Sequence, residues 1–271
     1  MSWFHAAVYG LLQGLTEYLP ISSTAHILIA GRLLGWGDPS AAFTAVIQIG
    51  TILAVLVYFR EDLVHLTTGF ARSLRDRNLA DPDGRTAWLI GIGSLPIMAI
   101  GYLARHVVEG SARNLILVGI ALVVGGGVLA AADGRREGSL DVQHLTMRLA
   151  LILGIGQTFA LIPGVSRSGA TIATGLFLGF GRYAATRFSF LLAIPAVVVS
   201  GLYELRKVTD GQVAWGPTLL ATLVSFIVGL ASIHWLLRFV STHTFKWFVW
   251  YRVLLGIAVL ALVAVGFVTA S

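Results

Sequence analysis

The stretch NLILVGIALVVGGGVLAAA, Asn114–Ala132, decides the fold class because it is long, apolar and without a charged residue. A helix crosses the core of a bilayer with roughly 20 consecutive apolar residues. Comparable runs occupy five other parts of the chain: Ala41–Phe59, Thr86–Leu103, Ala184–Tyr203, Thr218–Leu237 and Phe248–Val268. The runs lack the alternation of barrel strands, and helices also satisfy backbone groups in lipid. We therefore predict an all-α integral membrane protein, a polytopic helical bundle forming a single membrane domain over residues 1–271.

The composition of the whole chain agrees with a lipid environment. Of its 271 residues 56% are hydrophobic and only 12% are charged, about half the charged fraction of an average soluble domain. The net charge of +6 is explained by loop arginines that orient membrane proteins, and no patch of basic and aromatic residues favours nucleic-acid binding. The absence of cysteine excludes disulfides and thiolate metal sites.

Two polar stretches predict the orientation of the bundle. Arg60–Arg85 and Asp133–Arg148 both contain several arginines, and two predicted crossings separate them, so they lie on the same side of the membrane. Short loops rich in arginine favour the cytoplasm. We therefore predict two cytoplasmic loops here.

Two further apolar stretches, Gly10–Gly35 and Gly154–Gly181, do not fit simple crossings. Each is interrupted by a proline and by a cluster of polar residues. Proline removes a backbone donor and stops a helix, whereas Ser and Thr just beyond it favour the start of the next helix. Each stretch is predicted to be a helix, a break and a second helix, folded back as a re-entrant pair.

The two interrupted stretches also resemble each other. PISSTAH at 20–26 stands 143 residues before PGVSRSG at 163–169, and a long helix follows each. The match predicts two repeats, of about residues 1–135 and 136–271. From the start of Ala41–Phe59 to the start of Ala184–Tyr203 the chain makes three crossings, and an odd number reverses direction, so the repeats are predicted to have inverted topology. In such folds the interrupted segments meet near the midplane and form the site.

Glu17 is an acidic residue inside an apolar segment, and Gln13 lies one turn before it on the same helix face. An ionisable group in a membrane costs roughly 2.5 kcal/mol or more and is functional by default. The alternative is a Glu17 that pairs with an arginine only to hold helices together. His26 could shuttle a proton near neutral pH, although a single histidine on an apolar face is more often structural.

Arg167 is the matching cation, placed just before the second helix of its pair. Helix N-termini and glycine N–H groups attract anions, and a guanidinium suits phosphate. The hydroxyls of Ser166, Ser168 and Thr171, with the backbone at Gly164, complete a predicted anion nest. The alternative is a capped helix start whose arginine extends to the membrane interface.

Three hydroxyls, Ser22, Ser23 and Thr24, follow the first break. At least one of them is predicted to cap the next helix. A serine beside a base becomes a nucleophile, so a chemical role near Glu17 is a second interpretation. Gln48 is predicted either to line the same cavity or to hydrogen-bond a neighbouring helix.

The segments QGLTEYLPISSTAH (13–26) and PGVSRSGAT (163–171) resemble the two signature motifs of the undecaprenyl-diphosphate phosphatase family, bacterial membrane enzymes of the bacitracin-resistance type. AFTAVIQIG (42–50) is similar to the family's segment after the first motif. The likeness covers essentially the full chain. It implies a hydrolase that removes the terminal phosphate of undecaprenyl diphosphate and so recycles the carrier lipid for peptidoglycan synthesis.

The resemblance also implies residue roles. It makes Ser23 the candidate nucleophile, Arg167 the phosphate clamp, and His26 a proton-transfer or phosphate-contacting group. The family's first motif is Glu or Gln, three residues, then Glu; here it has the Gln form, which leaves Glu17 as the essential acid. A divalent cation, Mg²⁺ or Ca²⁺, is implied, with Glu17 as its candidate ligand. The predicted substrate contacts are Gln13, Ser22, Thr24, Gln48, Gly164, Ser166, Ser168 and Thr171.

The implied partner is a polyprenyl diphosphate lipid in the bacterial inner (plasma) membrane, with the site facing the extracytoplasmic side. A homodimer is left open. The alternative function is a lipid-phosphate flippase or anion transporter that uses the same midplane site, because broken helices in inverted repeats are also transporter architecture.

Overall fold

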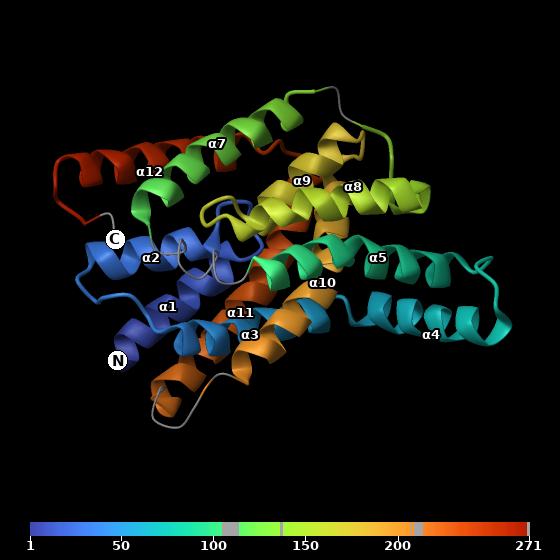
Figure 1. The fold of residues 1–271 in the computed structure, drawn as a ribbon, viewed down its shortest axis with the longest axis horizontal. Coiled ribbons are helices and arrows are strands. Elements are labelled where there is room, and N and C mark those ends of the chain that lie inside the picture. Colours follow the sequence, from blue (N-terminus) through green and yellow to red (C-terminus); the bar gives the residue numbers. More distant parts are fainter. Residues whose placement is uncertain (105–113, 136–137, 207, 209–213, 270–271) are drawn as a thin grey trace.

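The computed structural model describes residues 1–104, 114–135, 138–206, 208 and 214–269. Within them the chain forms the helical bundle of Figure 1. Among the described residues, six helices are long and apolar enough to cross a membrane: α3 (Ala41–Tyr58), α5 (Pro82–Leu103), α7 (Leu115–Asp133), α10 (Arg182–Leu205), α11 (Trp215–Val240) and α12 (Lys246–Ala264). Each overlaps one of the six predicted runs, so the polytopic all-α prediction is confirmed.

Both predicted breaks are present. The first separates α1 (Trp3–Thr16) from α2 (Ser23–Leu33), and the second separates α8 (Met147–Thr158) and the short η2 (Phe159–Leu161) from α9 (Arg167–Phe177). In Figure 1 the two pairs meet in the middle of the bundle, with α1 and α2 in blue and α8 and α9 in yellow-green and yellow.

The residue that caps the second helix is a serine with the same conformation in both pairs. Ser22 and Ser166 have φ of 74° and 72°, a left-handed backbone that is uncommon outside glycine. Each side chain accepts the N–H of the residue three positions on, Ala25 or Gly169. The two breaks therefore share one local structure, whereas the inverted orientation of the two halves stays a prediction.

The predicted loop Arg60–Arg85 is corrected by the structure. Most of it is a helix, α4 (Arg60–Asp76), which follows α3 directly and packs along α5. Its charged residues share the helix with Leu63 and Leu66, which pack against the core, so the polar stretch is an amphipathic helix. In the second predicted loop, Asp133–Arg148, residues 136 and 137 lie outside the described part, and the rest includes the single turn η1 (Val142–His144).

Glycines bring the first helix of each pair close to a crossing helix. A Cβ on Gly10 of α1 would stand 2.3 Å from the carbonyl oxygen of Ala221 in α11. A Cβ on Gly154 of α8 would stand 2.0 Å from the carbonyl oxygen of Gly93 in α5. Small residues allow helix backbones to approach closely in a membrane, where packing replaces the hydrophobic driving force. These contacts pack the first helix of each pair tightly against a membrane-spanning helix.

Gly154→Ala is expected to lower the free energy of unfolding by about 1–3 kcal/mol, because the added methyl meets a backbone oxygen that has no freedom to move. Thermal unfolding in detergent measures the effect. Gly91→Ala on α5 is the control, since its Cβ would have no neighbour within 4 Å. Equal unfolding temperatures for the two variants would contradict the packing argument.

Candidate active site

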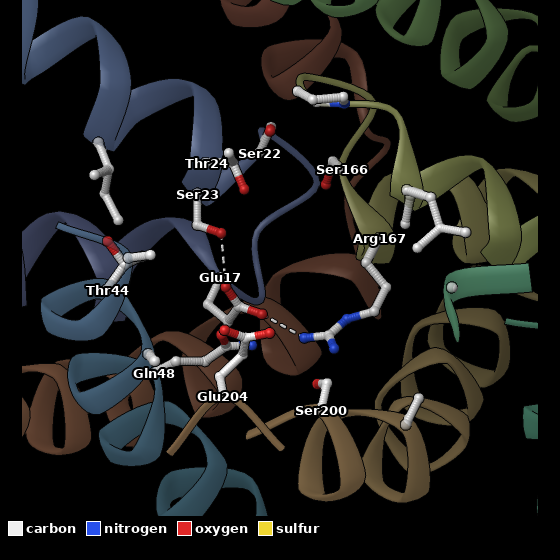
Figure 2. A pocket seen from close by; sticks show the side chains of 18 of the residues that line it. Glu17, Ser22, Ser23, Thr24, Thr44, Gln48, Ser166, Arg167, Ser200 and Glu204 are labelled. Atoms are coloured by element: carbon white, nitrogen blue, oxygen red, sulfur yellow. Dashed lines mark hydrogen bonds and ion pairs between the residues drawn. The ribbon is translucent and has the colours of Figure 1, made fainter. Parts of the chain in front are cut away.

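A pocket of about 750 Å³ lies between the two breaks and is also lined by α3, α5 and α10. Figure 2 shows its polar part, to which both broken segments contribute. Its other walls are apolar and include Ile97 and Met98 of α5, Ile162 of the second break and Val199 of α10. A cavity that is polar in one part and apolar in another suits an amphipathic ligand.

Glu17 stands at the centre of the polar part, at the point where α1 ends. One carboxylate oxygen accepts the Ser23 hydroxyl at 2.6 Å and the Gln13 side-chain amide at 3.0 Å. The other oxygen pairs with the Arg167 guanidinium. The structure therefore joins the acid of the first motif to the cation of the second motif, as the dashed lines in Figure 2 show.

Ser23 and Arg167 are the first residues of α2 and α9, and the positive ends of both helices lie at the pocket. Unpaired N–H groups at a helix start favour an anion there. The Ser23 hydroxyl is within the reach that a general base needs. A pair that served only to join helices would need neither this hydroxyl nor the cavity beside it.

Six of the predicted substrate contacts line the pocket: Gln13, Ser22, Thr24, Gln48, Gly164 and Ser166. Of the two interpretations of Gln48, the structure therefore favours the cavity-lining one. Ser22 is also the helix cap that the hydroxyl cluster predicts.

The structure does not bring Ser168 and Thr171 into the pocket wall. Ser168 is buried and donates to the carbonyl of Leu19, which ties the second pair to the first break. Thr171 is fully buried and donates to the carbonyl of Arg167 one turn earlier. Both hydroxyls point into protein because they lie on the packed face of α9, which a motif in one dimension does not reveal.

His26 also lies outside the pocket lining. Its Nδ1 bonds the carbonyl of Ser22 at 2.7 Å, and its Nε2 bonds the Tyr251 hydroxyl at 2.6 Å. The two rings are stacked, with centroids 5.5 Å apart. Because both ring nitrogens are hydrogen-bonded within the protein, His26 holds the backbone of the first break. This geometry favours a structural role for His26 over proton transfer.

Several residues at or behind the site are not among those predicted from the sequence. Ser200 and Glu204 of α10 project into the pocket (Figure 2). On α12, outside the pocket lining, Tyr251 bonds His26 of α2 and Arg252 bonds the carbonyl of Pro20 in the first break. Arg252 lies inside the predicted crossing Phe248–Val268, so the rule that intramembrane charges are functional identifies it in the sequence.

A divalent cation in the pocket would need oxygen ligands from the side chains that line it. Within the described ranges no group of three or more His, Cys, Asp or Glu side chains comes together. The pocket does contain the carboxylates of Glu17, Glu204 and Asp38 and the side-chain amide of Gln13, and Asp38 pairs with Arg32. Mg²⁺ commonly binds one or two carboxylates, substrate phosphates and several waters. The oxygen donors fit an ion shared with a phosphorylated ligand.

Comparison with known proteins gives the same family as the motifs. The family described as Bacitracin resistance protein BacA matches residues 6–258. The chain belongs to this family. The match spans both breaks, the pocket and Arg252, so the whole site of this BacA-family protein lies inside the shared region.

Curated relatives align along the whole BacA-family chain. Undecaprenyl-diphosphatase 2 of Frankia casuarinae is 50% identical, over 98% of this chain and 96% of its own length. Undecaprenyl-diphosphatase of Nocardioides sp. is 50% identical and that of Mycobacterium ulcerans 47% identical, each over 100% of both chains. The family predicted from the two motifs is therefore confirmed.

Proposed function

We propose that the protein is an undecaprenyl-diphosphatase, a membrane phosphatase that converts undecaprenyl diphosphate to undecaprenyl phosphate and inorganic phosphate. The observation that carries the proposal is the Ser23 hydroxyl held on the Glu17 carboxylate, with Arg167 beside them at a part-apolar pocket. The names of the full-length relatives support the substrate. The product would return to peptidoglycan synthesis as carrier lipid. The flippase or transporter alternative has no comparable support, since transport does not need a serine on a carboxylate.

In the proposed first step, Glu17 takes the proton of Ser23 as Oγ bonds to the terminal phosphorus. The bond from that phosphorus to the bridging oxygen breaks, and undecaprenyl phosphate leaves with the electron pair and receives the proton from Glu17. In the second step water attacks the phosphoserine. Its hydroxyl goes to the released phosphate, and its remaining proton passes through Glu17 to Ser23.

Arg167 and the two helix N-termini supply positive charge for these steps. The guanidinium has five N–H donors in a planar fork, so pairing with Glu17 leaves donors for phosphate oxygens. Fixed donors stabilise the charge that moves to the bridging oxygen in the transition state. A divalent cation, when bound, would neutralise further phosphate charge, and Glu17 and Glu204 are the carboxylates that would hold it.

We place the pocket on the extracytoplasmic side of the inner membrane. The pocket is lined by the N-terminal half of α3 and by the C-terminal ends of α5 and α10. The opposite ends of α3 and α5 lead into α4 and its arginines. Arginine-rich segments favour the cytoplasm, which supports an opening on the other side. The homodimer stays a prediction.

Removal of divalent cations is expected to abolish phosphate release by the purified protein. The assay measures inorganic phosphate from a C15 or C55 prenyl diphosphate in detergent, with and without EDTA. We expect activity to return on addition of Mg²⁺ or Ca²⁺. Phosphate release that is unaffected by EDTA would contradict the cation requirement. If folded protein releases no phosphate at all, the proposed phosphatase function is wrong.

A further inference from the structure

Arg252 has an unusual environment for a charge. Its side chain is fully buried in α12, and no carboxylate of the described residues pairs with it. Its guanidinium instead donates to main-chain carbonyls: Pro20 at 3.1 Å, Gly164 at 3.2 Å, Val165 at 2.8 Å and Ala121 at 3.4 Å. Burying a charge without a counter-ion costs several kcal/mol, so its place needs an explanation.

Three of the four carbonyls bound by Arg252 belong to the two breaks. Pro20 lies in the first break, Gly164 and Val165 lie in the second, and Ala121 lies in α7. Backbone outside a helix has unpaired carbonyls, which at membrane depth must find donors in protein or water. One planar guanidinium with several diverging N–H groups binds acceptors on both segments at once.

We propose that Arg252 is a positioning residue that sets the relative position of the two edges of the pocket. One edge contains Glu17 and Ser23, and the other contains Ser166 and Arg167. A second contact from the same helix acts alongside it, because Tyr251 holds His26 and so the backbone of Ser22. α12 contributes no residue to the pocket lining within the described chain, so it acts through the breaks. The catalytic consequence rests on the proposed phosphatase function.

The neighbouring helix provides a way to displace the guanidinium without removing it. A Cβ on Gly125 of α7 would stand 2.1 Å from a terminal nitrogen of Arg252 and 3.0 Å from its Cζ. A Cβ on Gly127, two residues farther along α7, would have no neighbour within 4 Å. The two glycines have the same helical backbone, so alanine changes at them form a matched pair.

Gly125→Ala and Arg252→Lys are expected to lower kcat about tenfold or more, with KM changed much less, since a misplacement near 1 Å costs on the order of 100-fold. Lysine keeps the charge but loses the fork. Gly127→Ala is expected to keep the wild-type kcat. A merely structural Arg252 predicts a lower unfolding temperature and yield, with normal kcat in the folded fraction, and that result would overturn the proposal.

A distance measurement separates positioning from activity. The chain has no cysteine, so spin labels at Thr24→Cys and Ile162→Cys report one position on each pocket edge. We expect the label distance to broaden or shift with Gly125→Ala and to stay unchanged with Gly127→Ala. An unchanged distance in both Gly125→Ala and Arg252→Lys overturns the proposal. If the wild type releases no phosphate, the function proposal fails, and the label distances alone decide the positioning.

Discussion

Ser23→Ala and Glu17→Gln are each expected to lower kcat for prenyl diphosphate hydrolysis by about 10³-fold or more, because a nucleophile and its base are removed. The Ser23 hydroxyl donates to Glu17 at 2.6 Å, so the two act as one unit. Residues of one catalytic unit are strongly non-additive. The double variant is therefore expected to be little slower than either single variant.

Single-turnover experiments with labelled terminal phosphate test the Ser23 role directly. Acid-quenched wild-type protein is expected to retain label as phosphoserine, and Ser23→Ala is expected to retain none. Ser241→Ala is the matched control, since Ser241 lies at the end of α11 and its hydroxyl bonds only the nearby carbonyl of Arg238 in the described chain. If Ser23→Ala retains single-turnover activity, the serine is not the nucleophile, and a water activated by Glu17 attacks the phosphorus instead.

Arg167→Ala is expected to lower kcat/KM by about 10³-fold or more, by analogy with arginines that stabilise a transferring phosphoryl group. Arg167→Lys keeps the charge and loses the fork, so a smaller loss of about 10²-fold is expected. KM should rise as well, because the guanidinium contacts phosphate before and during the reaction. Steady-state kinetics on C15 prenyl diphosphate measure both quantities.

Stability separates the catalytic role of Arg167 from the ion pair. The Glu17 side chain is only 9% exposed, so losing Arg167 leaves a poorly solvated carboxylate and should lower the unfolding temperature. Adding Glu17→Gln to Arg167→Ala removes that charge and is expected to restore stability but not activity. Full activity in the fraction of Arg167→Ala protein that remains folded would support the alternative in which the Glu17–Arg167 pair only joins helices.

Local patterns predicted much of the site. The two breaks follow from proline and capping residues next to each other in the chain, and Ser22 and Ser166 confirm the helix starts. Glu17 was identifiable because an intramembrane acid is costly enough to require a reason. The chain's membership of the BacA family confirms the resemblance that the two motifs indicate.

Other features depended on which helix faces meet. The stretch Arg60–Arg85 has the charge of a loop, but apolar residues at helical spacing place most of it in α4. The hydroxyls of Ser168 and Ser166 stand two residues apart, yet only Ser166 lines the pocket. For His26 the resemblance implied proton transfer or phosphate contact and its place on an apolar face favoured a structural role, and Tyr251, 225 residues away, occupies its second nitrogen.

The resemblance of the motifs to the family selected Ser23 as the candidate nucleophile. The sequence by itself determined the membrane helices, the two breaks and the candidate site residues Glu17 and Arg167. Those properties depend on apolar length and on neighbours within a few residues. Only the tertiary structure decided that Glu17 and Arg167 pair, that Glu204 enters the pocket and that Arg252 joins both breaks. Each of these contacts joins helix faces from distant parts of the chain, and their meeting depends on how all the helices pack.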